Sequence, residues 1–340
     1  MKNYYGFNRK NGTTSPDVWA DDELMDSNIT ADLEKNKAAL PRYKIFMALS
    51  RTPHGVIDMA TPCFAALIWL GEFPSFGVTL LGLITAFAGY TAVYALNDVI
   101  DYANDRMKLA QEISKRSGPD IDGIWIRHPL AQGILPYRNG VYWVVAWASV
   151  AIIGAWLLNP VCLMIFVAGC ILETLYCKML KISHYRVLVS GTVKTLGAVA
   201  AVYAVDLSPS PVFVVILFLF LYVWEIGGQN IPNDWSDVHE DKQIGARTVP
   251  VRLGIHRSAV LILGCILVTL LLNVWVFKFS RAVYDPVYLV AALGAGVYLL
   301  LIPALRLITT KSDEDAMRLF NRGSYYPLAL MAIVLMKIIF

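Results

Sequence analysis

Long apolar blocks separated by short polar stretches dominate the chain from residue 56 onward. About nine of these blocks come close to the ~20 residues that an α-helix needs to cross the hydrocarbon layer of a bilayer. Their approximate bounds are 56–72, 77–97, 140–158, 161–177, 187–205, 211–230, 258–277, 286–304 and 324–340. The pattern predicts an all-α, multi-pass membrane protein with about nine transmembrane helices.

The first 41 residues differ from the rest because they are polar and contain no apolar core ahead of a cleavage site. A secretory signal peptide would need such a core. We therefore expect residues 1–41 to be a cytosolic tail and residues 42–340 to form one transmembrane domain.

The composition agrees with this division. Hydrophobic residues make up 57% of the chain and charged residues 16%, against about 25% charged residues in an average soluble domain. A formal net charge of +3 is too small to indicate nucleic-acid binding, and no feature indicates an obligate protein partner. The five cysteines form no Cys-x-x-Cys pair, which argues against a zinc site or a disulfide scaffold.

Basic residues fall almost entirely in alternate loops. The loops 99–138, 178–186, 229–257 and 305–322 hold seventeen Lys and Arg residues, and the other loops hold only Lys278 and Arg281. Lys and Arg are enriched in the cytoplasmic loops of membrane proteins. We therefore expect the N-terminus and the long polar loops to be cytoplasmic and Phe340 to lie on the far side. In a bacterium, the protein would lie in the inner membrane.

Two acidic motifs share one spacing, N-D-x-x-D-x-x-x-D. The first runs from Asn97 to Asp105 and the second from Asn233 to Asp241. On a helix, offsets of three, four and seven residues fall on one face. Each motif is therefore predicted to stack three carboxylates along one stripe, Asp98, Asp101 and Asp105 in the first and Asp234, Asp237 and Asp241 in the second.

Such stripes need a cation. An Asp at the centre of a membrane helix costs about 2.5–3.5 kcal/mol on insertion scales, and neighbouring carboxylates repel one another. All-oxygen ligands favour magnesium or calcium over zinc, and magnesium typically bridges a few carboxylates to substrate phosphates. The two motifs therefore predict a Mg²⁺ site, with all six Asp side chains as metal ligands and catalytic residues. A merely solvated helix end is a poor explanation for two matching copies.

The chain resembles the UbiA superfamily of intramembrane prenyltransferases. The paired Asp motifs carry most of the resemblance, and the second is followed by Gly245, Thr248 and Pro250. The stretch His128–Gly133 resembles the family's basic-Pro-x-x-x-Gly segment, and Tyr176–His184 resembles its Tyr-x-x-x-Lys segment. The resemblance implies a helical bundle around a central cavity that opens to the cytoplasm and laterally to lipid.

The resemblance also implies roles for individual residues. Asn97 and Asn233 would orient phosphate or metal ligands, and Tyr176 belongs to the same site. Positive charge for the diphosphate would come from Lys181, Arg127 and His128, in or near the family segments. Arg51 belongs to a stretch that resembles the family's Arg-x-Pro entry, where it would either contact phosphate or act as an ordinary interfacial anchor. The family's lysine position falls on Leu180 here, so we expect Lys181 to replace it and Lys178 to act only as an interfacial anchor.

Four further charged residues lie inside the predicted spans: Asp58, Glu173, Lys194 and Glu225. Ionisable residues at such depth are functional-site candidates by default. Glu173 and Glu225 could face the cavity. For Lys194, pairing between helices is the favoured explanation.

The function implied is Mg²⁺-dependent transfer of a prenyl group from a polyprenyl diphosphate to an aromatic or other lipid-soluble acceptor. A terpene cyclase on the same scaffold would use the same motifs. A lipid-phosphate phosphoribosyltransferase is disfavoured because the second motif is intact. A cation-coupled transporter is also disfavoured, because transporter sites lie near the membrane midplane and these motifs end their spans.

The charge asymmetry generates a topological prediction. Single cysteines placed in the loops 106–127 and 242–256 of a cysteine-free variant should resist an impermeant thiol reagent applied to intact cells. The same cysteines should react after the cells are lysed. Efficient labelling of either loop in intact cells would contradict the orientation.

Overall fold

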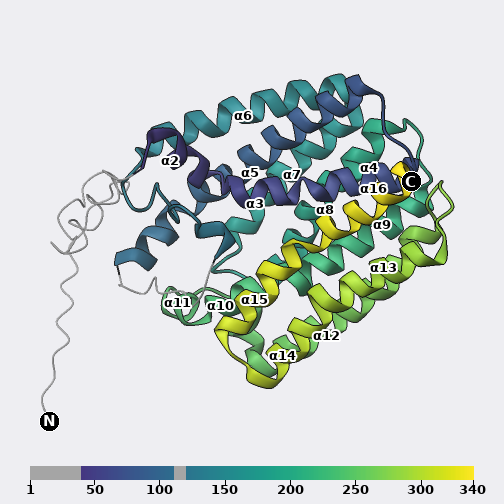
Figure 1. Cartoon of the computed structure of the whole chain (residues 1–340). Coiled ribbons are helices and arrows are strands. Elements are labelled where there is room, and N and C mark those ends of the chain that lie inside the picture. Colours follow the sequence, from purple (N-terminus) through teal and green to yellow (C-terminus); the bar gives the residue numbers. More distant parts are fainter. Residues whose placement is uncertain (1–39, 111–119) are drawn as a thin grey trace, which may run out of the picture. The chain divides into compact units, whose positions relative to one another are not determined.

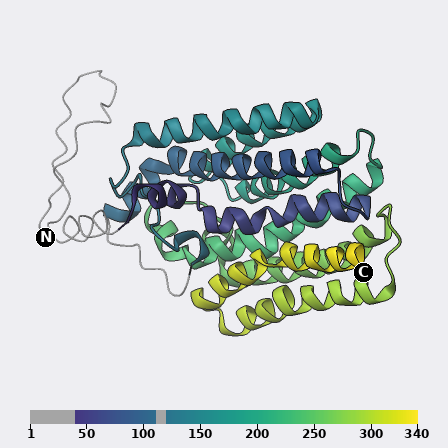
Figure 2. The same ribbon diagram turned by 45° about the horizontal axis from the view of Figure 1, so that its top comes forward.

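The computed structural model describes residues 40–110 and 120–340, and all regular structure in these residues is helical. The predicted N-terminal tail lies outside the described residues, apart from its last two positions. Figure 1 shows the long helices side by side in a bundle, and Figure 2 shows the same arrangement from a second direction. The prediction of an all-α membrane fold is confirmed for the described part of the chain.

The helices follow the predicted spans closely. The α-helices are α2 (Arg42–Leu49), α3 (Thr52–Asp58), α4 (Ala60–Leu70), α5 (Phe76–Ala110), α6 (Tyr137–Leu158), α7 (Pro160–Lys178), α8 (Arg186–Val205), α9 (Pro211–Trp224), α10 (Ile231–Ser236), α11 (Val238–Gln243), α12 (Val249–Lys278), α13 (Pro286–Gly296), α14 (Ile302–Thr310), α15 (Asp313–Ser324) and α16 (Tyr326–Ile339). A 3₁₀ turn, η1 (Ile121–Gly123), and two π-helical segments, η2 (Glu225–Asn230) and η3 (Val297–Leu301), complete the order.

Eight helical paths in the described residues are long and apolar enough to cross a membrane, judged by length and composition. They match eight of the predicted spans. The remaining span, 56–72, is formed by α3 and α4, which meet at Met59 with helical backbone angles of φ −59° and ψ −19°. Pro62 lacks the N–H that would bond the carbonyl of Asp58, so the series of helix hydrogen bonds is interrupted between α3 and α4.

The segment η2 interrupts the sixth predicted span just before the second Asp motif. Pro232 has no N–H to offer the carbonyl of Gly228. The side chain of Gln229 takes that place, because its Nε2 donates to the Gly228 carbonyl at 3.0 Å and to the Phe320 carbonyl at 3.0 Å. The irregular turn is thus hydrogen-bonded and tied to α15.

The apolar core lies where α4, α8, α9, α12 and α16 pack together. Its largest fully buried side chains include Phe64, Phe213, Phe220, Trp224 and Tyr326. Large apolar side chains on the outer faces, such as Ile153 and Leu271, are exposed, as expected for positions in contact with lipid. The short helices α2, α10 and α11 lie at one end of the bundle, opposite the C-terminus (Figure 1). We call this the motif end, because α10, α11 and the last turns of α5 carry both Asp motifs.

Close packing of η2 against α12 generates a stability prediction. A Cβ atom added at Gly227 would lie 2.4 Å from the Cβ of Cys265 and 3.2 Å from the Ile262 carbonyl oxygen. Overpacking of this kind typically costs about 1–3 kcal/mol. Gly227→Ala should therefore lower the midpoint of thermal unfolding in detergent. Gly264→Ala is the matched control, because its Cβ would meet nothing within 4 Å; equal midpoints for both variants would contradict the packing argument.

Candidate functional site

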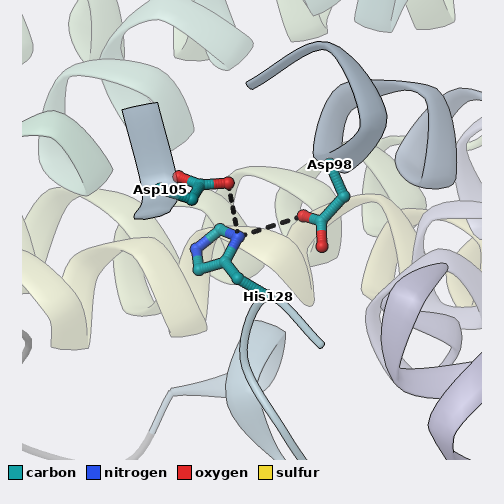
Figure 3. A group of neighbouring side chains, drawn as sticks. All are labelled: Asp98, Asp105 and His128. Carbon is teal, nitrogen blue, oxygen red and sulfur yellow. Dashed lines mark hydrogen bonds and ion pairs between the residues drawn. The ribbon is translucent and has the colours of Figure 1, made fainter. Parts of the chain in front are cut away.

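The first Asp motif occupies the last turns of α5. Asp98 and Asp105 lie two turns apart on one face, as predicted. The side chain of His128 reaches between them: its Nδ1 lies 3.1 Å from Asp98 Oδ1 and 2.9 Å from Asp105 Oδ2 (Figure 3). A histidine from a distant loop therefore links two carboxylates of one helix.

The loop that carries His128 has an unusual backbone. His128 has φ 52° and Gly133 has φ 68°, values in the left-handed region that residues other than glycine seldom adopt. Gln132 Nε2 donates to the Arg127 carbonyl at 2.6 Å, which closes the turn. Burial alone would lower the pKa of His128, but the neighbouring Asp105 and Asp98 outweigh it and raise the pKa to about 9. His128 is therefore cationic at neutral pH.

Arg51 approaches the same motif from the junction of α2 and α3. Its guanidinium donates to Asn97 Oδ1 at 3.2 Å and to Asp122 Oδ2 at 3.2 Å, and it lies 3.5 Å from Asp98 Oδ1. Burial lowers the pKa of Arg51, but Asp122 and Asp98 more than compensate and raise it overall. The geometry places Arg51 beside the first motif, a position that the sequence alone did not predict.

The second motif does not lie on one continuous helix, so the prediction of a single helical stripe is wrong for it. The helix α10 ends at Ser236, and Asp237 has φ −102° and ψ 9° before α11 begins. Ser236 Oγ donates to the Asn233 carbonyl at 2.7 Å, a local bond that competes with helix continuation. Asp234, Asp237 and Asp241 nevertheless all face one cavity.

Cations from the region of the first motif reach the second motif. Lys108 Nζ on α5 lies 2.9 Å from Asp241 Oδ1. Arg127, the neighbour of His128, lies 3.1 Å through its NH2 group from Asp237 Oδ2. The two motifs therefore face each other across a narrow polar space that positive side chains bridge.

The cavity between the motifs has a volume of ≈640 Å³. Its polar lining at the motif end includes Arg51, Asn97, Asp101, Asp105, Lys108, Arg127, His128, Tyr176, Arg186, Asn233, Asp234, Asp237 and Asp241. Asp98 is absent from this lining, since it is buried behind His128 and Arg51. Most of the predicted site residues thus converge on one cavity.

Beyond the motifs the cavity becomes mostly apolar. Its walls there are formed by α4, α5, α7 and α8, including Ala66, Leu67, Val78, Leu83, Ala86, Gly89, Ile165, Phe166, Leu196 and Ala200. Lining residues on α5 extend from Val78 to Lys108, a distance of about 45 Å at 1.5 Å per residue. The cavity is therefore an elongated chamber with a charged mouth.

Arg186 is a cavity cation that the sequence reasoning did not single out. It is 5% exposed, and its guanidinium carbon lies 3.9 Å from the centre of the Tyr176 ring. It begins α8 and was counted only among the charges of a loop. Its position at the start of a span is also typical of an interfacial anchor, so the sequence alone carries no signal that separates the two roles.

Lys181 and Lys178 both lie outside the cavity lining. Lys181 is exposed, and its Nζ lies 3.9 Å from Met107 Sδ; Lys178 is exposed at the end of α7. The turn that follows α7 carries Lys181 away from the charged mouth. The geometry therefore gives no support to the predicted contact between Lys181 and a diphosphate, whereas Arg186 lines the cavity.

The remaining charges inside the spans each have at least one polar partner in the bundle. Lys194 binds Asp58 and donates to the Tyr94 hydroxyl at 2.7 Å, which agrees with the predicted pairing between helices, although with Asp58 as the partner. Glu173 Oε1 accepts a bond from Asn97 Nδ2 at 2.7 Å. Glu173, Lys194 and Glu225 all line the cavity.

The donor set fits a hard divalent cation. Five motif carboxylates line the mouth, and the buried Oδ2 atom of one of them, Asp234, has no hydrogen-bond partner among the described residues. Carboxylate oxygens are the ligands that Mg²⁺ prefers. Asp98, Asp105 and His128 also offer atoms within 4.8 Å of one another.

Comparison with known proteins identifies the family. The family model described as the UbiA prenyltransferase family matches residues 59–325. The chain belongs to the UbiA prenyltransferase family. It is therefore a membrane prenyltransferase, and the resemblance inferred from the sequence is confirmed.

Curated relatives of this UbiA protein are distant. The digeranylgeranylglyceryl phosphate synthase of Thermococcus kodakarensis is 20% identical over 219 residues, covering 64% of this chain and 72% of that protein. The synthase of the same name from Thermococcus sibiricus is 24% identical over 216 residues, covering 64% of this chain and 71% of that protein.

Solved UbiA structures share the fold. A UbiA homolog from Archaeoglobus fulgidus bound to GPP and Mg²⁺ superposes with a TM-score of 0.63 at 16% identity, covering 87% of this chain and 100% of that chain. The apo UbiA homolog from Aeropyrum pernix K1 gives a TM-score of 0.63 at 18% identity, covering 83% and 97% of the two chains.

The cavity geometry predicts that Arg186 contributes more to activity than Lys181 or Lys178. Arg186→Ala should lower kcat/KM for a prenyl diphosphate about tenfold or more, the usual scale for a lost charge-assisted contact. Arg186→Lys should be intermediate, because lysine keeps the charge but not the planar stacking on Tyr176. Lys181→Ala and Lys178→Ala should change kcat/KM less than about twofold at matched expression. A larger loss from Lys181→Ala than from Arg186→Ala would restore the sequence-based assignment.

Proposed function

We propose that the chain transfers a prenyl group from a polyprenyl diphosphate to an aromatic or other lipid-soluble acceptor, with Mg²⁺ as cofactor. The observation that carries this proposal is the shape and polarity of the single cavity described above. Two facing carboxylate clusters stand at its mouth, and an apolar chamber about as long as a membrane-spanning helix lies behind them. An isoprenoid diphosphate has the same division between charged head and apolar tail.

The diphosphate would lie at the mouth among residues that can bind its oxygens. Asn97 and Asn233 offer amide groups, and Arg51, Arg127, His128 and Arg186 offer positive charge. The motif carboxylates Asp101, Asp105, Asp234, Asp237 and Asp241 would hold Mg²⁺, with Asp98 supporting them through His128 and Arg51. The A. fulgidus homolog bound to GPP and Mg²⁺ supports this arrangement by its fold.

The reaction would begin when the bond between the allylic carbon and the diphosphate oxygen breaks. Mg²⁺, when bound, supplies positive charge that stabilises the departing diphosphate. The guanidinium of Arg186 and the ammonium of Lys108 add preorganised charge at the same end. Aromatic side chains of the wall, including Tyr90, Tyr94 and Phe166, face the cavity and can stabilise an allylic cation.

The positive-inside asymmetry places the motif end toward the cytoplasm in this proposal. The loops at that end would take up a diphosphate from the aqueous phase while the tail enters the bundle. The eight apolar paths keep the protein within the bilayer as a multi-pass enzyme.

Removal of the metal or of single carboxylates tests the proposal. Transfer of label from a radiolabelled prenyl diphosphate to extractable lipid should stop in excess chelator and return with added Mg²⁺. Asp101→Asn and Asp234→Asn should each lower kcat about 100-fold or more, since both remove charge from the electrostatic centre of the reaction. A cyclic product without any acceptor would instead identify a terpene cyclase.

Asp206→Asn serves as the matched control. Asp206 follows α8 and pairs with Trp69 and Arg281, and it is not part of the cavity lining. This variant should keep full activity. Undiminished turnover in chelator, or equal losses from all three variants, would refute the proposed role of the motifs.

A further inference from the structure

Next to the charged mouth of the cavity, the segment η2 presents two buried polar side chains to the same space. Glu225 and Asn230 are five residues apart, the spacing that brings side chains together in a π-helix. Glu225 is 5% exposed and Asn230 is 6% exposed, and both line the cavity beside Ser190 on α8. Short π-helical segments frequently occur at functional sites.

The hydrogen bonds of this cluster run in one direction. Asn230 Nδ2 donates to the Tyr176 hydroxyl at 3.0 Å and to Ser190 Oγ at 3.0 Å. Ser190 Oγ in turn donates to Glu225 Oε1 at 3.0 Å. Both amide hydrogens of Asn230 and the hydroxyl hydrogen of Ser190 are therefore used within the cluster.

Two acceptor atoms of the cluster receive no hydrogen bond. Glu225 Oε2 and Asn230 Oδ1 are buried and have no hydrogen-bond partner among the described residues. A buried acceptor without a donor is costly, and buried polar groups are generally satisfied by protein, water or ligand. With the Asn230 amide in this orientation, the cluster can accept a hydrogen bond from a molecule in the cavity.

The position of the cluster relates it to the reaction. Tyr176 contacts both Asn230, through its hydroxyl, and the guanidinium of Arg186 at the charged mouth, through the face of its ring. On the other side of the cluster the apolar chamber begins. A molecule held by Glu225 and Asn230 would therefore lie just inside the mouth, next to the end of a prenyl chain that carries the diphosphate.

We propose that Glu225 and Asn230 form the acceptor subsite and that the acceptor is a neutral molecule that presents a hydroxyl group there. The inference rests on the proposed function, because it names the second substrate of the same cavity. A hydroxyl supplies the missing donor to the unpaired oxygens. The ammonium of Lys194 is already bound to Asp58 and so is not available to pair with an anionic ligand, which the unpaired carboxylate oxygen of Glu225 also disfavours.

Two probes that differ only in a donor test this subsite. para-Pentylphenol carries an O–H, and para-pentylanisole has a methyl group in its place. With the full chain in lipid nanodiscs, the phenol should bind the wild-type protein about tenfold more tightly than the anisole, the scale of one hydrogen bond to a charged group. Glu225→Leu should abolish this preference, and Glu225→Gln, which keeps an acceptor oxygen, should retain part of it.

Glu173→Gln is the matched control, since it makes the same change at another buried carboxyl of the cavity whose Oε1 already accepts from Asn97. It should leave the phenol preference unchanged within about twofold. The wild-type comparison needs no variant, so misfolding of Glu225→Leu leaves the test intact. Equal binding of the two probes, no binding of the phenol, or an unchanged preference in a folded Glu225→Leu protein would overturn the subsite, with water then serving the unpaired oxygens.

Binding of a prenyl diphosphate with and without Mg²⁺ is measured on the same wild-type protein. Magnesium-dependent binding together with equal binding of the two probes would reject the acceptor subsite and leave the proposed function standing. Absence of diphosphate binding would reject the proposed function, whatever the two probes show.

Discussion

Carboxylates can gather at the mouth of this cavity because cations from separate segments lie between them. Arg51 comes from the α2–α3 junction, Lys108 from α5, Arg127 and His128 from one loop, and Arg186 from α8. Buried charges without partners are strongly destabilising. Each of these segments is therefore needed to keep the carboxylates of the mouth paired. The mouth is thus a product of tertiary assembly, and the loop 124–136 is as much a part of it as the motif helices.

The two motifs share one spacing, but their carboxylates are arranged differently around the cations of the mouth. The first is part of an unbroken helix, and one of its carboxyls, Asp98, is turned into the protein to hold Arg51 and His128. The second is preceded by the π-helical η2 and broken at Asp237, so all three of its carboxyls reach the cavity. The same local irregularity also brings Glu225 and Asn230 together. A departure from ideal helix geometry therefore shapes both the charged mouth and the polar cluster inside it.

Hydrophobic blocks predicted the helices well, because a span of lipid length leaves little choice of structure. The spacing of the motifs likewise predicted the convergence of their carboxylates. The sequence did not reveal which cations complete the site. Arg186 and Lys181 are both basic residues near the end of a span, and only the turn after α7 makes one buried and the other exposed. The break at Asp237 was also missed, since no proline or glycine marks it in the sequence and the side chain of Ser236 bonds back to the chain there.

The uninterrupted course of α5 has a consequence for how the family can vary. Each residue of a helix turns the chain by about 100°. Gain or loss of one residue between Tyr90 and Asn97 would swing Asp101 and Asp105 out of the mouth while leaving the apolar wall in place. The sixth span contains the irregular turn η2, which can compensate for a change in the direction of the side chains that follow it. The helix α5 contains no such turn. Insertions and deletions in relatives should therefore fall outside α5. The number of residues in α5 between the apolar chamber and the charged mouth should stay constant.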